Sequence, residues 1–424
     1  MSANQNPRVL ATYLIETAHP LEQAAAMMAG EQSAGTFVKV PGETEELLAN
    51  HGATVERITP LETVDQPSLP GAKLPRGQQQ QQAEYQRAEV VLSFPFENIG
   101  ASLTTLITTI SGNLYELGPF SGLRLLDVDI PPIFRSVYPA PQFGVEGTRR
   151  LAGVYGRPLL GTIIKPSVGL SPEATAALVR TLCEAGLDFI KDDELQTNSP
   201  HSPLRARVDA VMRVINDHAQ ATGKKVMYAF NITADLDDML RHHDIIEAQG
   251  GTCVMVNLLA VGAAAVARLR QHSALPIHGH RAGWGALSRH PLLGMSYVAF
   301  QKLMRLAGVD HLHVNGLRNK FCESDESVIE SARACLTPLF GDDPVLPVFS
   351  SGQWAGQAPD TYQALNSVDL LYLAGGGIMA HPAGPAAGVA SLRQAWEAAM
   401  QGLALDEYAQ SHEALRQSIE MFSR

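Results

Sequence analysis

The feature that most constrains the fold is a repeat of short apolar strands with polar ends, which alternates with helical stretches from Leu159 onward. This alternation is typical of parallel sheets in which helices cover the strands. Eight such units close into a (β/α)8 barrel of the TIM type. We predict strands at residues 159–166, 189–194, 226–232, 253–259, 276–282, 311–316, 346–351 and 371–376.

The first connecting helix shows how the sequence marks the ends of these units. Ser171 can cap the helix, Pro172 suits its first turn, and Gly186 can end it. Val179 and Leu182 lie on its apolar face. This segment therefore predicts a helix that packs against the barrel and returns the chain to the next strand.

The chain before residue 130 follows a different pattern. Strands are expected at residues 8–16 and 88–96, and helices at residues 20–29, 42–51 and 101–110. We predict a smaller α+β domain of the ferredoxin-like kind over residues 1–130, followed by the barrel domain over residues 131–424.

The composition excludes several classes of partner. The net charge is −11 and no basic stripe is present, so we expect no nucleic-acid partner and no anionic membrane partner. Neither a leader-like segment nor an apolar run of about 18 residues occurs, which predicts a cytoplasmic protein. The four cysteines form no CxxC pair, so we expect reduced, buried thiols in place of a zinc site or disulfides.

The segment from Lys191 to Glu194, Lys-Asp-Asp-Glu, closes the second predicted barrel strand. Because side chains alternate along a strand, Lys191 and Asp193 should share the barrel-facing side, and Glu194 can turn toward the same point. A neutral lysine can add carbon dioxide and become a carbamate, which would supply a third hard oxygen for Mg²⁺. The alternative is a surface charge cluster at a strand end.

Two further strands place pairs of imidazoles on one face. His278 and His280 lie on the fifth strand, and His311 and His313 lie on the sixth. The HxH pattern is also typical of zinc sites. In amidohydrolase-type barrels, however, that pair belongs on the first strand, where this chain carries Lys165 instead. His278 and His311 are expected to be packed core histidines.

Small residues end the last two predicted strands. Ser350-Ser-Gly352 and Gly375-Gly-Gly377 expose backbone N–H groups that phosphate can approach closely. The loops after strands seven and eight often bind phosphate in (β/α)8 barrels. Glycines of this kind are equally common in simple tight turns.

The segments Gly161-Thr-Ile-Ile-Lys-Pro-Ser-Val-Gly-Leu170 and Gly186-Leu-Asp-Phe-Ile-Lys-Asp-Asp-Glu194 together resemble the corresponding pair in RuBisCO large chains. The resemblance implies one Mg²⁺ per site, held by carbamylated Lys191, Asp193 and Glu194. It also implies that Lys165 handles substrate protons.

The same resemblance extends to other parts of the chain. It makes His280 an active-site imidazole and assigns substrate phosphate to residues on the later strands: Arg281, His313, Ser350, Gly352, Gly375 and Gly376. In the N-terminal domain it implies that one protomer covers the barrel mouth of its partner through Glu31, Thr36 and Asn113. A homodimer with shared active sites is therefore expected.

Several positions depart from the pattern of carboxylating enzymes. Ser167 stands where a second lysine follows the strand-one Lys-Pro, and Trp284 stands where a histidine is expected. The loop after strand six reads Asn-Gly-Leu-Arg-Asn-Lys-Phe over residues 315–321. Lys320 is in the register of the catalytic lysine, and Arg318 is an equally good phosphate partner. Carbon fixation is therefore not expected.

These departures indicate a RuBisCO-like protein that acts on a phosphorylated sugar acid. The chain is similar to the group that decarboxylates 3-oxo-isoapionate 4-phosphate, or transfers its carboxyl group and hydrolyses it, through an enediolate. The alternatives are a methionine-salvage enolase or isomerase, or a non-catalytic scaffold. The enolase uses a lysine base where this chain has Asn113, and the survival of the charged site residues argues against the scaffold.

Overall fold

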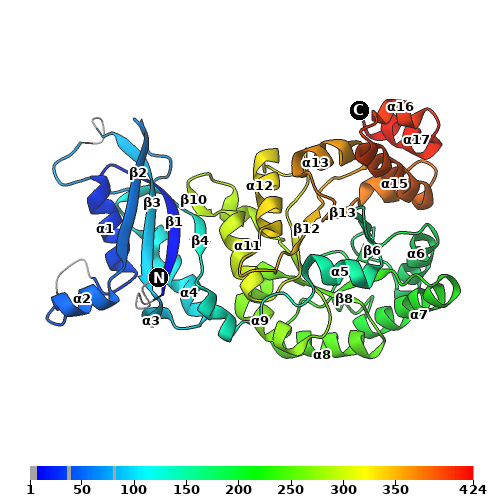
Figure 1. Cartoon of the computed structure of the whole chain (residues 1–424), viewed down its shortest axis with the longest axis horizontal. Helices are drawn as coiled ribbons and strands as arrows, with labels where there is room; N and C mark the ends of the chain where they lie inside the picture. The colour runs from blue at the N-terminus through cyan, green and yellow to red at the C-terminus, as the bar shows by residue number, and fades with distance from the viewer. Residues whose placement is uncertain (1–6, 36–39, 80–82, 424) are drawn as a thin grey trace. The chain divides into compact units, whose positions relative to one another are not determined.

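The computed structural model describes residues 7–35, 40–79 and 83–423. The chain forms two compact units (Figure 1). The first contains the described part of residues 1–139 together with residues 283–306. The second contains residues 140–282 and the described part of residues 307–424. The inclusion of residues 283–306 in the first unit was not anticipated from the sequence.

The first unit is built on a five-stranded sheet with the order β10-β4-β1-β3-β2. Its strands are β1 (Arg8–Thr17), β2 (Thr54–Val64), β3 (Tyr85–Pro95), β4 (Phe120–Asp129) and β10 (Leu293–Met295). All neighbours are antiparallel except β10 and β4. The predicted strands correspond to β1 and β3, whereas β2, β4 and β10 were not predicted.

Helices accompany this sheet. They are α1 (Leu21–Glu31), α2 (Glu45–His51), α3 (Phe96–Ile99), α4 (Leu103–Ile110), α10 (Gly285–Ser288) and α11 (Tyr297–Leu306), with 3-10 turns η2 (Gly112–Glu116) and η3 (Pro132–Ser136). The three helices predicted in this region correspond to α1, α2 and α4. The cap of α4 is the side chain of Ser102, which accepts from the backbone N–H of Thr105.

The second unit is a closed parallel barrel with the strand order β11-β12-β13-β5-β6-β7-β8-β9, and the predicted (β/α)8 fold is confirmed. The strands are β5 (Leu159–Ile163), β6 (Phe189–Lys191), β7 (Met227–Asn231), β8 (Cys253–Asn257), β9 (Ile277–His280), β11 (His311–His313), β12 (Leu346–Phe349) and β13 (Leu371–Leu373). Each strand is shorter than predicted, because the residues at its predicted carboxyl end already belong to the following loop or helix.

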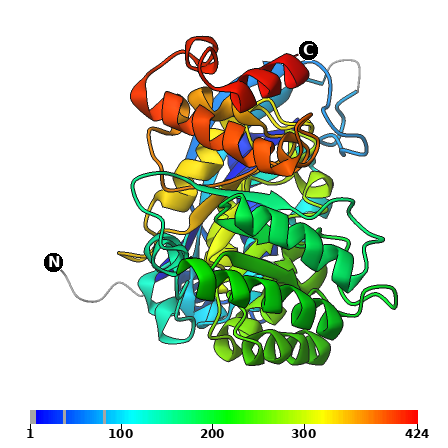
Figure 2. The ribbon, with the colours of Figure 1, turned by 90° about the vertical axis from the view of Figure 1, so that its right-hand side faces the viewer.

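Helices surround this barrel, and Figure 2 shows those in green side by side. They are α6 (Pro172–Glu184), α7 (Leu204–Thr222), α8 (Leu236–Ala248), α9 (Leu258–His272), α12 (Asp325–Leu336), η4 (Ala355–Gln357), α13 (Ala358–Leu365), α14 (Gly376–Met379), α15 (Pro385–Gln401), α16 (Leu405–Ala409) and α17 (Glu413–Phe422). The predicted start of α6 is confirmed, because Ser171 accepts from the backbone N–H of Ala174 and Pro172 is the first helical residue.

Helix α5 (Gly144–Ala152) precedes the first barrel strand and lies at the amino end of the barrel. Phe143, which precedes α5, and Gly144, its first residue, donate backbone N–H bonds to Asp310, which directly precedes β11. An apolar core is formed by residues from α5, from the segment after it and from the barrel strands: Val145, Ala152, Val154, Leu159, Phe189, Met227, Ala229, Cys253, Met255, Leu346, Val348, Leu371 and Leu373. Such close packing makes the barrel a solid support for the groups at its carboxyl end.

Two expectations from composition can be compared with the structure. No helix among the described residues is long and apolar enough to cross a membrane. All four cysteines are free, as expected. Three of them are buried, but Cys322 is exposed, so the expectation of four buried thiols was wrong for that residue. Cys322 lies in the polar loop after β11, where few apolar side chains are available to cover it.

Candidate active site

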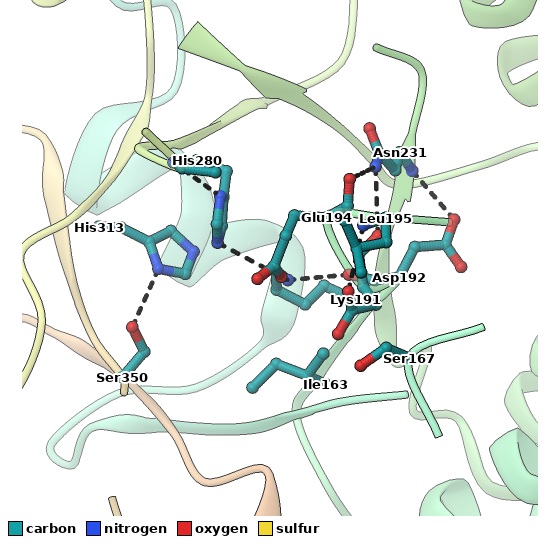
Figure 3. Close-up of polar contacts among 12 residues, drawn as sticks. Ile163, Ser167, Lys191, Asp192, Glu194, Leu195, Asn231, His280, His313 and Ser350 are labelled. Carbon is teal, nitrogen blue, oxygen red and sulfur yellow. Dashed lines mark hydrogen bonds and ion pairs between the residues drawn. The ribbon is translucent and has the colours of Figure 1, made fainter. Parts of the chain in front are cut away.

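The charged residues that follow β6 gather at the carboxyl end of the barrel (Figure 3). Lys191 is the last residue of β6 and is 1% exposed, and Asp193 is also buried. The Lys191 Nζ atom lies 3.8 Å from Oε2 of Glu194 and donates a hydrogen bond to the backbone oxygen of Asp192 at 2.8 Å. The three predicted metal ligands are therefore brought together.

The environment of Lys191 favours an uncharged amine. Burial lowers the pKa of this lysine, and the charges of Glu194 and Asp193 only partly oppose that effect. Among the described residues, the nearest carboxylate oxygen paired with its Nζ is that of Glu194, at 3.8 Å, which is too far for a hydrogen bond. A buried, weakly paired lysine beside two carboxylates is suited to carbamate formation, and the resulting hard oxygens suit Mg²⁺.

Lys165 follows β5 and reaches the same place from the neighbouring strand. Its Nζ lies 2.6 Å from Oδ2 of Asp193 and donates to Oγ of Ser167 at 2.9 Å. Ser167 occupies the position where carboxylating enzymes carry a second lysine, and here its hydroxyl holds the amine of Lys165. Lys165 is 39% exposed, so its amine faces both the carboxylate and the open side of the site.

His280, the last residue of β9, is oriented by the backbone. The N–H of Ala282 donates to Nδ1 of His280 at 3.1 Å, so the ring proton resides on Nε2. That Nε2 lies 3.6 Å from Oε2 of Glu194. Burial holds the pKa of His280 well below its usual value, so the ring is neutral. The predicted active-site imidazole therefore lies beside a predicted metal ligand.

Asp192 and Asn231 position this loop, and neither was singled out from the sequence. The Asp192 carboxylate accepts from the hydroxyl of Tyr228 at 2.6 Å and from Arg207 at 3.2 Å. The side-chain amide of Asn231 donates to the backbone oxygens of Asp193 and Glu194. The only sequence signal was the place of Asn231 at a barrel strand end.

The predicted phosphate-binding side chains on the later strands form two separate contacts. His313 ends β11, and its ring points to the hydroxyl of Ser350 (Figure 3). The distance from Nδ1 of His313 to Oγ of Ser350 is 3.0 Å. Arg281 forms an ion pair with Glu323, which also accepts from the side chain of Asn315. Glu323 was not predicted, because nothing in the sequence shows that the loop after β11 returns to β9.

The predicted glycines lie just after barrel strands β12 and β13. A Cβ at Gly352, whose φ is +92°, would lie 3.7 Å from Cβ and from the backbone nitrogen of Lys320. A Cβ at Gly375 would lie 3.9 Å from Cε of Lys165. Gly376 is open to its surroundings. The structure thus brings Lys320 beside Gly352 and Lys165 beside Gly375.

Two positions that depart from the carboxylase pattern have structural roles. Arg318 forms an ion pair with Asp360 at 2.5 Å, so it is held by α13. Trp284 packs with the rings of Tyr297 and Phe300 inside the first unit. In place of the expected histidine, the chain thus has a buried aromatic residue.

The predicted contributions of the N-terminal domain are only partly described. The side-chain amide of Asn113 donates to Oε1 of Glu31 at 3.2 Å, so these two residues lie together in the first unit. Thr36 lies outside the described residues. The role of all three in a partner's site stays a prediction.

A second group of possible metal ligands lies on α8 and α9. Nδ1 of His243 and Nε2 of His272 lie 3.1 Å and 2.6 Å from Oδ1 of Asp244. Nε2 of His243, however, is buried without a hydrogen-bond partner among the described residues. Binding a metal through Nδ1 would move the ring proton to this isolated nitrogen, so the cluster fits hydrogen bonding better than metal binding.

The sequence matches the family models described as the catalytic domain of the ribulose bisphosphate carboxylase large chain over residues 144–422, and its N-terminal domain over residues 3–134. The chain belongs to the RuBisCO large-chain family. It is 50% identical to a RuBisCO-like protein from Burkholderia fungorum of known crystal structure, with a TM-score of 0.91 and coverage of 98% of this chain and 100% of the other.

Two curated relatives within the RuBisCO family are informative. The chain is 54% identical to a 3-oxo-isoapionate-4-phosphate transcarboxylase/hydrolase from Xanthobacter autotrophicus, over 97% of this chain and 98% of the relative. It is 48% identical to a 3-oxo-isoapionate-4-phosphate decarboxylase from Rhizobium etli, over 97% and 98% of the two chains. The predicted resemblance to this group is confirmed.

Proposed function

We propose that this protein is a Mg²⁺-dependent enzyme that acts on 3-oxo-isoapionate 4-phosphate, either as a decarboxylase or as a transcarboxylase/hydrolase, without net fixation of carbon dioxide. The observation that carries the proposal is the buried, weakly paired Lys191 beside Asp193 and Glu194. Relatives named for each activity are about equally similar, at 54% and 48% identity.

Lys191 as a carbamate, Asp193 and Glu194 would hold one Mg²⁺ through hard oxygen atoms. When bound, the ion would supply positive charge that stabilises an enediolate developing on the substrate. Asp192 and Asn231 keep the backbone of these ligands fixed through the contacts described above. The chain therefore provides a preorganised group of anions whose mutual repulsion a cation relieves.

Lys165 is placed to move protons at the reacting carbon atoms. Its amine donates a hydrogen bond to Asp193 and lies beside the small Gly375. Loss of a carboxylate from a β-keto acid leaves an enediolate that must receive a proton at carbon. Lys165 can give that proton and recover it from solvent, because it is partly exposed.

The groups that follow β9, β11, β12 and β13 are suited to an anion. Arg281, His313 and Ser350 offer guanidinium, imidazole and hydroxyl groups, and Gly352, Gly375 and Gly376 leave the backbone accessible. We assign the substrate phosphate to them. Lys320, beside Gly352, would contribute a further positive charge. For Arg281 to bind the phosphate, its ion pair with Glu323 must be replaced by one with the substrate.

We further propose a homodimer with shared active sites, in which Glu31, Thr36 and Asn113 of one protomer contact the substrate bound by its partner. An enolase of the methionine-salvage kind needs a basic amine at Asn113. The amide there cannot take up a proton at neutral pH and instead contacts Glu31. The methionine-salvage reaction is therefore disfavoured.

The experiment is to incubate the purified protein with 3-oxo-isoapionate 4-phosphate, Mg²⁺ and bicarbonate, and to follow carbon dioxide and the phosphorylated products. A decarboxylase releases one carbon dioxide for each substrate consumed, whereas a transcarboxylase/hydrolase cleaves the substrate without net release. Turnover of a methylthio-sugar phosphate in place of this substrate, or no turnover of either, would refute the proposal.

A further inference from the structure

Three buried imidazoles and two hydroxyl groups form a single file of hydrogen bonds through the barrel. The file begins at Thr148 in α5, at the amino end, and reaches Ser350 at the carboxyl end (Figure 3 shows its last contact). In order, its contacts are Thr148 Oγ1 to His311 Nε2 at 2.8 Å, His311 Nδ1 to His278 Nδ1 at 3.3 Å, His278 Nε2 to His313 Nε2 at 2.7 Å, and His313 Nδ1 to Ser350 Oγ at 3.0 Å.

Each ring in this file is neutral. All three imidazoles are buried, and burial lowers the pKa of each one, in the case of His311 to about 3. A neutral imidazole has one N–H group and one bare nitrogen. Each contact between rings holds one proton, so the direction of one hydrogen bond determines the direction of the next.

The amino end fixes this direction. Oγ1 of Thr148 lies 2.5 Å from the backbone oxygen of Gly144, which can only accept a hydrogen bond. The hydroxyl proton of Thr148 is used there, so His311 must donate through Nε2. It follows that His278 donates through Nδ1 and His313 through Nε2. Nδ1 of His313 is then bare and accepts the hydroxyl proton of Ser350.

We propose that His278 and His311 are positioning residues that hold His313 in its Nε2–H tautomer, and that Thr148 sets this tautomer from the opposite end of the barrel. The histidines on β9 and β11 that were expected only to fill the core thus act on a substrate-binding residue. The effect is carried by hydrogen bonds and needs no movement of the backbone.

The consequence for ligand binding rests on the proposed function, in which His313 and Ser350 bind phosphate. When Ser350 turns its hydroxyl toward a phosphate monoanion, the bare Nδ1 of His313 can accept a hydrogen bond from the P–OH group, while Nε2 donates to His278. With the file reversed, Nδ1 of His313 would carry the ring proton and could not accept from that group.

The test compares Thr148→Val, which removes the hydroxyl at constant shape, with Thr148→Ser, which keeps it. Histidines labelled with ¹⁵N report the tautomer of each ring, and the His313 signals are assigned by their loss in His313→Gln. We expect Nε2–H in the wild type and in Thr148→Ser, and Nδ1–H in Thr148→Val, because His311 can no longer donate to Thr148. An Nδ1–H tautomer in the wild type, or an unchanged tautomer in Thr148→Val, would overturn the proposal.

Calorimetry with inorganic phosphate measures the consequence. We expect the affinity of Thr148→Val to fall about tenfold, because the hydrogen bond from the P–OH group to Nδ1 of His313 is lost, while Thr148→Ser stays at the wild-type value. Equal affinities for the two variants would overturn the role in phosphate binding. Neither measurement uses 3-oxo-isoapionate 4-phosphate, so failure here is distinct from failure of the proposed function.

A second pair of variants covers the case in which Thr148→Val does not fold. His278→Gln keeps an oxygen that can accept from Nε2 of His313, whereas His278→Leu removes the acceptor. We expect His278→Gln to retain the Nε2–H tautomer of His313 and His278→Leu to lose it. The same tautomer in both variants would contradict the proposal.

Discussion

A buried charged residue lies at each end of strand β6, and the two differ in how well they are paired. At the amino end, Asp188 accepts two hydrogen bonds from Arg157, one from Lys224 and one from the backbone N–H of Leu160. At the carboxyl end, Lys191 has only a backbone oxygen at hydrogen-bond distance among its described contacts, and its nearest carboxylate is 3.8 Å away. The satisfied end stabilises the barrel, and the unsatisfied end is ready to bind a ligand.

The largest expected effect is on activity and concerns Lys191, at the carboxyl end of β6. Replacing Lys191 by Met keeps the apolar stem but removes the amine. We expect turnover of 3-oxo-isoapionate 4-phosphate to fall by a factor on the order of 10³ or more, because a charge-stabilising group worth several kcal/mol is lost. Steady-state kinetics measure the effect. Because the amine forms no close ion pair, we expect denaturant unfolding to show little change in stability. A large loss of stability, with the turnover of the folded fraction unchanged, would contradict the account of the carboxyl end.

The amino end should respond in the opposite way. In Asp188→Asn the guanidinium of Arg157 loses its buried counter-ion, and we expect the free energy of unfolding to fall by about 3 kcal/mol. Urea unfolding gives this value. The kcat of the native fraction should equal that of the wild type, since Asp188 lies at the other end of the strand. A selective loss of kcat without loss of stability would show that the two ends are not separate in function.

The pH dependence of stability sharpens the same contrast. Burial acts to raise the pKa of Asp188, but the hydrogen bonds and charges of Arg157 and Lys224 outweigh it and hold the pKa below the usual value. The contribution of Asp188 is therefore complete above the unfolded-state pKa of about 3.9 and is lost as the pH falls through the lower folded-state pKa. We expect the stability difference between wild type and Asp188→Asn to shrink as the pH falls from about 4 toward about 2. A constant difference across that range would contradict this assignment.

The smallest expected effect concerns the second cation on Asp188. Lys224 is 31% exposed, and Arg157 remains when it is removed. We expect Lys224→Met to lower the free energy of unfolding by about 1 kcal/mol, without change in kcat. A loss as large as that of Asp188→Asn would show that Lys224, and not Arg157, provides most of the pairing.

The barrel was predictable because its strands are apolar runs that end in polar residues, and the eight predicted strands match β5–β9 and β11–β13. In the first unit, β2 was missed because most of its residues are exposed and Pro60 interrupts its pattern. Strand β10 was missed because three residues give no periodicity, and it pairs with β4, about 170 positions earlier in the chain.

The candidate site was predictable where its residues follow one another in sequence. Lys191, Asp193 and Glu194 lie within four positions, and the resemblance to the RuBisCO family supplied their roles. Contacts between distant positions were not predictable. Glu323 meets Arg281 from 42 positions away, and Tyr228 reaches Asp192 from 36. Those contacts depend on how the barrel brings neighbouring strand ends together.

The most direct test of the central claim is ¹³C NMR of the protein equilibrated with ¹³C-bicarbonate and Mg²⁺. The account predicts a carbamate signal that increases with Mg²⁺, is absent from Lys191→Met, and rises together with turnover of 3-oxo-isoapionate 4-phosphate. Full turnover in the absence of any carbamate signal, or in Lys191→Met, would contradict it.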